Sequence, residues 1–171
     1  MRVGIAGYGV VGKTRHRSIE ANTSYQVTAI SESNEHARTS IPEGLEVHND
    51  YKSLIASAPI DIIFISLPNQ FAAEATCLSL KKGLHVFCEK PPARTHAELL
   101  EVQKQSLKFS DLKLMYGFNH RFHLSVEEAS SIINGNSLGR IINMKGVYGK
   151  SQMISFNQTD WRTNREASGG G

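Results

Sequence analysis

The chain has 171 residues and a formal net charge of +3, with 40% hydrophobic and 20% charged residues, as in an ordinary globular protein with a buried core. Its 19 basic residues are scattered, so nothing in the composition supports binding to nucleic acid or to a membrane surface. No apolar run has the length of a membrane span, and the chain opens on a strand-like run without a signal peptide. We therefore expect a cytoplasmic protein.

Residues that commonly bind metals or form disulfides are sparse. Cys77 and Cys88 are the only cysteines, and both lie in apolar stretches, so we expect two buried thiols in a reducing compartment. His120 and His123 have the spacing of a metal-binding pair, but no cysteine or carboxylate supports them at ligand spacing. Two ordinary histidines are the favoured interpretation, and no metal is expected.

The first 32 residues alternate between strand and helix patterns. Residues 2–6 form a short apolar run, residues 7–12 read Gly-Tyr-Gly-Val-Val-Gly, and a helix is expected from there to about residue 21. Residues 25–31 form a second strand-like run, which Glu32 closes, 20 residues after Gly12. A glycine turn between strand and helix, with an acid at this distance, indicates a dinucleotide-binding βαβ unit.

Each glycine of the loop has a physical role. Gly7 permits the turn off the strand, Gly9 lets a pyrophosphate approach the backbone, and Gly12 lets the helix pack closely. The unpartnered N–H groups of the first helical turn face the phosphates. The expected cofactor contacts of this loop are those of Gly7, Tyr8, Gly9, Val10, Val11 and Gly12. The basic residues at positions 13–17 either assist phosphate binding or form a solvated helix face.

Glu32 decides the expected cofactor. A carboxylate accepts hydrogen bonds from a ribose diol and repels a 2′-phosphate, so NAD is favoured over NADP. Arg38 favours the opposite choice, with Ser31 and Ser33 as possible phosphate donors, and a register slip of one residue would replace Glu32 with a serine.

The following residues complete an α/β pattern. Residues 61–66 are a continuous apolar run, typical of a central parallel strand, and Thr95 with Glu98 resembles a capping box. The sequence predicts a Rossmann-type, doubly wound parallel sheet of six strands over residues 1–118. Expected strands are 2–6, 25–31, 45–47, 61–66, 84–88 and 112–117, and the later helices are 51–57, 70–82 and 95–109.

Residues 119–171 are predicted to begin a second, α+β domain. A helix is expected over 124–133, and residues 140–149 alternate enough to predict a strand. Trp161 and Arg162 are candidate substrate contacts, although packing or an interface explains them equally well.

Four motifs, taken together, resemble the Gfo/Idh/MocA family of NAD(P)-dependent oxidoreductases. They are Gly7-x-Gly9-x-x-Gly12, Leu67-Pro68-Asn69, Glu89-Lys90-Pro91 and Gly117-x-Asn119-x-Arg121-Phe122. The resemblance implies that Lys90 is catalytic, contacting the reacting hydroxyl and the nicotinamide ribose. It also implies that the cofactor site includes Leu67, Pro68, Asn69, Glu89, Lys90, Pro91 and Asn119, and that Arg121 lies near the substrate.

The chain departs from the family pattern in two ways. Ala72 stands where the family often has histidine, and the Asp and His that complete the family's catalytic site do not follow. We expect the N-terminal part of a longer enzyme, a homodimer or homotetramer when complete, with the fragment binding cofactor without turnover.

The expected function is hydride transfer between NAD and a sugar, nucleotide-sugar or polyol. Two alternatives remain: a non-catalytic dinucleotide-binding regulator or redox sensor, and a reductase or dehydratase relative with another substrate.

Overall fold

The computed structural model describes residues 1–147, 149, 161 and 164–169. The chain divides into two units, of which the first is Met1–Gly117 with Thr159–Gly171 and the second is Phe118–Gln158. The end of the first long segment lies one residue from the expected boundary at 118. The C-terminal segment groups with the first unit, and the expected second domain over 119–171 stays a prediction.

The first unit is built on a six-stranded sheet in which every pairing is parallel, in the order β3-β2-β1-β4-β5-β6. The order reverses between β1 and β4, so ligand-binding crevices are expected at the carboxyl ends of these strands. The predicted doubly wound Rossmann-type sheet is confirmed. Its strands are β1 (Arg2–Ala6), β2 (Gln26–Ser31), β3 (Glu46–His48), β4 (Ile62–Ile65), β5 (His85–Cys88) and β6 (Leu114–Tyr116).

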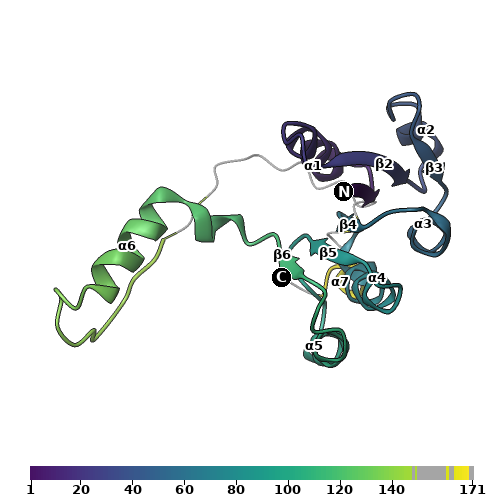
Figure 1. Cartoon of the computed structure of the whole chain (residues 1–171). Helices are drawn as coiled ribbons and strands as arrows, with labels where there is room; N and C mark the ends of the chain where they lie inside the picture. Colours follow the sequence, from purple (N-terminus) through teal and green to yellow (C-terminus); the bar gives the residue numbers. More distant parts are fainter. Residues whose placement is uncertain (148, 150–160, 162–163, 170–171) are drawn as a thin grey trace. The chain divides into compact units, whose positions relative to one another are not determined.

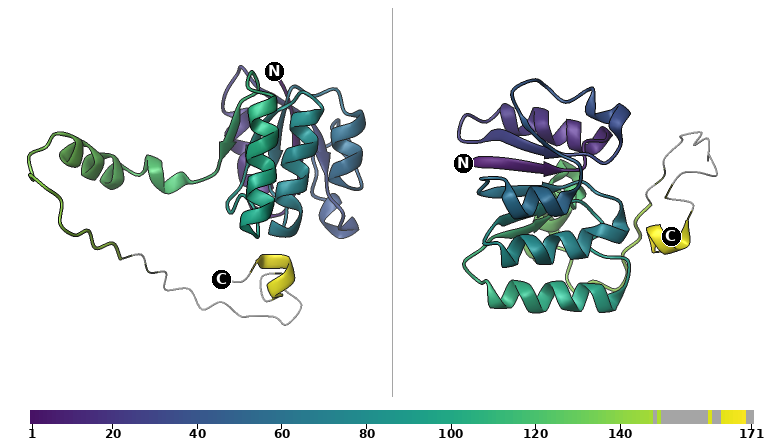
Figure 2. Two further views of the ribbon diagram at one scale, coloured as in Figure 1. Left: turned by 90° about the horizontal axis from the view of Figure 1, so that it is seen from below. Right: turned by 90° about the vertical axis from the view of Figure 1, so that its right-hand side faces the viewer.

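Helices cover both faces of this sheet (Figures 1 and 2). Helix α1 (Val10–Glu20) packs on one face, and α3 (Tyr51–Ser57), α4 (Asn69–Lys81) and α5 (His96–Lys108) lie along the other. The short α2 (Glu35–Arg38) connects β2 to β3.

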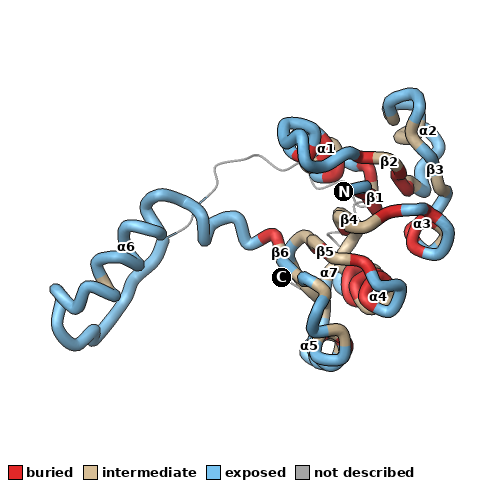
Figure 3. The backbone as a smooth tube through the Cα atoms, viewed as in Figure 1, coloured by how far each residue is buried: buried red, intermediate tan, exposed pale blue. Residues whose placement is uncertain are grey.

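The core follows from the alternation of side chains across the sheet (Figure 3). In β4, Ile63 and Ile65 are fully buried against the α3 and α4 side, while Ile62 and Phe64 pack against the α1 side. A strand covered on both faces needs a continuous apolar run, as predicted for residues 61–66.

Helix caps explain where several helices begin. Asn34 accepts hydrogen bonds from the N–H groups of residues 36 and 37, so it caps α2. Thr95 caps α5 by accepting from the Glu98 N–H at 3.2 Å, as predicted. The predicted capping box is only half formed, because the Glu98 carboxylate accepts from the N–H of Arg94 at 2.8 Å and not from that of Thr95.

The second unit contains the 3-10 turn η1 (Asn119–Phe122) and helix α6 (Leu124–Asn134). The strand predicted over 140–149 is wrong for residues 140–147 and 149, which have no regular structure; residue 148 lies outside the described residues. Alternating apolar residues define a face, but a strand also needs a hydrogen-bonded neighbour, which no described residue provides here. No helix in the described ranges is both long and apolar enough to cross a membrane.

The cysteines are both free thiols. Cys88 is buried as predicted, and burial raises the pKa of its thiol to about 12. Cys77 is only half-buried. Within the described part of the chain, no group of three or more His, Cys, Asp or Glu side chains is placed to hold a metal ion.

Candidate functional site

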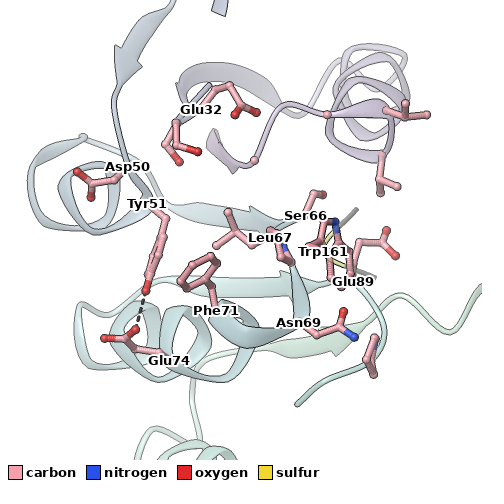
Figure 4. Close-up of a pocket in the computed structure, with 18 of the residues that line it drawn as sticks. Glu32, Asp50, Tyr51, Ser66, Leu67, Asn69, Phe71, Glu74, Glu89 and Trp161 are labelled. Atoms are coloured by element: carbon pink, nitrogen blue, oxygen red, sulfur yellow. Dashed lines mark hydrogen bonds between the residues drawn. The ribbon is translucent and has the colours of Figure 1, made fainter. Parts of the chain in front are cut away.

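A cavity of about 1060 Å³ lies at the carboxyl edge of the sheet, within the first unit (Figure 4). Glu32 follows β2 and Glu89 follows β5, and Figure 4 shows them on opposite sides of Leu67. The cavity therefore runs along the strand ends across the switch point between β1 and β4. The predicted residues that line it are Gly7, Gly9, Val10, Val11, Glu32, Leu67, Pro68, Asn69, Glu89, Lys90, Pro91 and Trp161.

The glycine loop presents bare backbone to this cavity. Gly7 has φ +87°, which permits the turn, and its N–H donates to the Ser31 carbonyl at 2.9 Å. A Cβ on Gly9 would have no atom within 4 Å. Helix α1 has no acidic residue in its first turn, and its N-cap Gly9 has no side chain to accept from the first amides. This end of α1 can therefore receive an anion, and the loop fits a pyrophosphate.

Glu32 is fixed by the loop that it faces. Its two carboxylate oxygens accept hydrogen bonds from the N–H groups of Tyr8 and Asn34, each at 2.9 Å. Strand β2 ends at Ser31, and the Glu32 N–H donates to the His48 carbonyl, so the acid stands directly at the strand end. The one-residue slip considered above does not occur.

Arg38, the main rival feature for a 2′-phosphate, is engaged elsewhere. Arg38 donates to the Asn49 side chain at 2.6 Å and to the Ser33 carbonyl at 3.3 Å. The Ser31 hydroxyl is buried and has no hydrogen-bond partner among the described residues, and Ser31 is one of the residues that line the cavity. Ser33 is exposed and lines the cavity.

A polar cluster that the sequence interpretation missed closes the Glu32 end. The Tyr51 hydroxyl donates to the Glu74 carboxylate at 2.6 Å (Figure 4), and Lys52 pairs with the same carboxylate at 2.7 Å. The Tyr51 ring packs against Phe71. Burial and the Glu74 hydrogen bond raise the pKa of Tyr51, while Lys52 and then Tyr51 lower that of Glu74. Only the fold brings α3 against α4 here, so no local motif could reveal the cluster.

Lys90 lies at the other end of the cavity. Its side chain is exposed and makes no hydrogen bond or ion pair with any described residue. The Lys90–Pro91 peptide bond is cis. The preceding Glu89 extends the sheet pairing, since its N–H donates to the Ile65 carbonyl at 2.9 Å. An exposed ammonium group is therefore available at this end of the cavity.

Helix α7 (Arg165–Ser168) packs beside this end, and this contact also was not predicted. The Asn69 side chain donates to the Ser168 carbonyl at 2.8 Å, and Arg94 donates to the Glu166 carbonyl at 2.6 Å. Glu98 orients Arg94 through hydrogen bonds of 2.6 and 3.1 Å. Ser168 and Trp161 thereby line the same cavity as Lys90.

Replacing Arg94 with alanine is expected to release α7. The change removes the bond to Glu166 and the ion pair with Glu98, which should cost about 1–3 kcal/mol of local stability. Tryptic cleavage after Arg165, followed by mass spectrometry, should accelerate several-fold. Lys104→Ala, which removes an exposed pair with Glu101 on the same helix, is the control and should leave the cleavage rate unchanged. Equal rates in both variants would contradict the anchoring role of Arg94.

Several predicted site residues lie elsewhere. The Tyr8 side chain is buried and bonds to His16, and Gly12 is buried under the loop, so only their backbones shape the site. Asn119 and Arg121 are exposed residues of η1 in the second unit, and their roles stay predictions. Arg162 lies outside the described residues.

The basic run after Gly12 is only in part the solvated helix face considered above, because Arg17 is exposed while other members of the run are held by neighbours. His16 is buried between the Tyr8 hydroxyl at 2.7 Å and the Glu20 carboxylate at 2.9 Å. Lys13 lies over the Tyr8 ring, and Arg15 pairs with Glu89.

Two curated relatives match most or all of the chain. D-glucoside 3-dehydrogenase of Escherichia coli is 29% identical over 145 residues, covering 82% of this chain and 41% of the relative. Levoglucosan dehydrogenase of Pseudarthrobacter phenanthrenivorans is 27% identical over 183 residues, covering 100% of this chain and 47% of the relative. The chain thus spans less than half the length of either relative.

Two solved structures of inositol dehydrogenases are similar to this chain in fold. Scyllo-inositol dehydrogenase from Lactobacillus casei, with bound NAD(H) and scyllo-inositol, matches with a TM-score of 0.74 and 26% identity over 81% of this chain and 42% of that one. Myo-inositol 2-dehydrogenase from Lactobacillus plantarum matches with a TM-score of 0.76 and 28% identity over 83% and 43%. The family model described as "Oxidoreductase family, NAD-binding Rossmann fold" matches residues 1–118, and the chain therefore belongs to the Gfo/Idh/MocA oxidoreductase family.

Proposed function

We propose that this chain binds NAD in the cavity described above and supplies the cofactor-binding part of a dehydrogenase acting on sugar or polyol hydroxyls. One observation carries the proposal: a single cavity contains, in order along the sheet, the Glu32 carboxylate, the open end of α1 and the Lys90 ammonium. These groups match the ribose, the pyrophosphate and the reacting end of a dinucleotide.

Different groups of the chain bind different parts of the cofactor. Glu32 accepts hydrogen bonds from the adenosine ribose, and its negative charge disfavours a 2′-phosphate. The first amides of α1 bind the pyrophosphate, to which Gly9 allows close approach. Leu67, Pro68 and Asn69 form the wall toward the nicotinamide end. When bound, NAD supplies the hydride-accepting group.

Lys90 is the proposed catalytic residue of this chain. Its ammonium, unpaired among the described residues, donates a hydrogen bond to the oxygen of the reacting hydroxyl and stabilises the negative charge that grows there. Removal of one such donor typically slows a reaction by about 10²–10³-fold. The proposal assigns no general base to this chain.

The substrate class is extended from the relatives, whose names specify a glucoside, levoglucosan and inositols. We include nucleotide-linked sugars in the class. Trp161, Arg121 and Arg162 are proposed as substrate contacts, and Asn119 as a contact to nicotinamide and substrate. The proposal also includes a cytoplasmic location and assembly as a homodimer or homotetramer.

Trp161 provides the direct test, because it is the only tryptophan and lines the cavity. NADH titration should quench its emission and excite the bound nicotinamide by energy transfer, whereas NADPH should bind at least tenfold more weakly. NAD reduction is then screened with inositols, glucosides and nucleotide sugars. If neither dinucleotide binds to the folded chain, the proposal fails.

Lys90→Met separates binding from chemistry. NADH affinity should remain within about threefold, while turnover by the full-length protein falls about 10²–10³-fold. Turnover that survives this change would remove Lys90 from the catalytic role. Binding with no turnover on any polyol or sugar would favour the sensor alternative.

A further inference from the structure

Arg15 and Glu89, 74 residues apart in sequence, form an ion pair next to the cavity, which Glu89 lines. The Arg15 Nε donates to Glu89 Oε1 at 2.6 Å, and Nη2 of the same guanidinium lies 2.5 Å from that oxygen. The side chains are only 26% and 15% exposed, so solvent screens the pair less than it would a surface pair. The contact joins the phosphate-facing helix α1 to the residue that precedes Lys90.

Aromatic side chains hold the guanidinium in place. Its Cζ lies 4.8 Å from the centre of the Phe87 ring, and Phe87 stacks on Phe64 with 4.8 Å between ring centres. Phe64 and Phe87 are paired residues of β4 and β5. Arg15 therefore packs on a rigid part of the sheet, and its position is well defined.

Glu89 is enclosed on its other side. A Cβ on Gly117 would lie 2.8 Å from Glu89 Oε2, so the carboxylate occupies space that the missing side chain leaves open. The Gly117 N–H donates to the Cys88 carbonyl at 2.8 Å, which holds this glycine beside β5. Together with the Glu89 N–H bond to Ile65, these contacts fix both backbone and carboxylate of Glu89.

Arg15 is not among the residues that line the cavity, whereas Glu89, Lys90 and Pro91 line it. Without Arg15, a nearly buried carboxylate would lose its counter-charge at the end of the cavity opposite Glu32. Any consequence should therefore appear at the nicotinamide end.

We propose that Arg15 is a positioning residue for the nicotinamide half of the cofactor, acting through Glu89 on the segment that contains Lys90. This inference rests on the proposed function. Arg15, a member of the basic run after Gly12, thereby has a role other than phosphate binding. The geometry around Lys90 then depends on α1.

Two ligands distinguish this role from phosphate binding. NADH contains the nicotinamide, while ADP-ribose has the same adenosine and pyrophosphate without it. Arg15→Met keeps the aliphatic packing on Phe87 and removes the charge. Calorimetric titration should show NADH binding weakened about tenfold and ADP-ribose binding changed less than about twofold. Arg17→Ala removes an exposed arginine of the same helix and should alter neither affinity.

A double-mutant cycle tests the route through Glu89. In a Glu89→Gln background, Arg15→Met should weaken NADH binding less than about twofold, because no carboxylate charge is left unpaired. Arg15→Lys restores the charge without the planar guanidinium and should lose only about threefold. If Arg15→Met does not fold, the Lys variant and the Glu89→Gln background provide the same comparison.

The contrary results of these titrations overturn different claims. Equal loss of NADH and ADP-ribose binding, or no loss of either, overturns the positioning role while leaving the proposed function intact. An additive cycle overturns the route through Glu89. If the wild-type chain binds neither ligand, the proposed function itself fails.

Discussion

Gly12→Ala is expected to lower the free energy of unfolding by about 2–4 kcal/mol and to abolish NADH binding, whereas Gly9→Ala should fold normally and lose only binding. The two glycines lie in the same loop, and each is replaced by alanine. They differ in what surrounds the added methyl group, so the pair separates folding from ligand binding.

The clash at Gly12 involves backbone atoms. A Cβ there would lie 2.1 Å from the Gly7 carbonyl oxygen and 3.1 Å from its carbon. Neither atom can rotate away, because Gly7 is itself held by the bond from its N–H to the Ser31 carbonyl. Helix α1 would have to move off the loop, and the phosphate-facing amides would move with it.

Gly9 has the opposite surroundings. Its backbone, at φ −71° and ψ −164°, is open to alanine, and the added methyl would meet nothing within 4 Å. Stability should stay the same or rise by up to about 1 kcal/mol, because the unfolded chain becomes less flexible. The methyl enters the space where a pyrophosphate would lie, so NADH affinity should fall about 100-fold.

Thermal unfolding and NADH titration of both variants check this pair. Normal NADH binding by Gly9→Ala would place the pyrophosphate somewhere other than at this loop. A Gly12→Ala protein as stable as wild type would show that α1 can shift at little cost.

The strands and helices of the first unit were predictable because their signals are local. The apolar run at 61–66, the glycine turn at 7–12 and the caps at Asn34 and Thr95 each depend on neighbours in sequence. Ends of elements shifted by one or two residues, since side-chain pattern marks a helix or strand more clearly than its last hydrogen bond.

The main contacts that were not predicted join distant parts of the chain. Arg15 pairs with Glu89 over 74 residues, and Asn69 bonds to Ser168 over 99 residues. In sequence, Arg15 is one of several adjacent basic residues, and nothing local shows that it faces Phe87 while its neighbour His16 is buried against Tyr8. The predicted strand at 140–149 failed for the related reason that strand formation requires a partner.

Replacement of Glu32 is the second change expected to have a large effect on NADH binding. Glu32→Ala should weaken NADH binding about 100-fold, because the change removes the ribose acceptor and leaves the N–H groups of Tyr8 and Asn34 without their carboxylate. Part of this loss of affinity should come from displacement of the glycine loop, because the Tyr8 N–H that Glu32 holds belongs to that loop. A moderate fall in stability, of about 1–2 kcal/mol, should accompany the loss.

Glu32→Gln isolates the contribution of charge. The amide has the size of the carboxylate and keeps one acceptor oxygen, so the loop should stay in place and NADH binding should fall only about tenfold. Repulsion of a 2′-phosphate disappears, and NADPH should bind at least as well as it binds wild type.

The informative quantity is the ratio of NADPH to NADH dissociation constants in wild type, Glu32→Gln and Glu32→Ala, measured by Trp161 quenching. The ratio should drop at least tenfold in Glu32→Gln, because charge and not shape sets the preference. Of the three proposed phosphate-site residues, Arg38 is bound to Asn49 and the Ser31 hydroxyl is buried, while Ser33 is exposed. NADPH should therefore gain little new attraction. An unchanged ratio in both variants would mean that Glu32 holds the loop and does not select the cofactor.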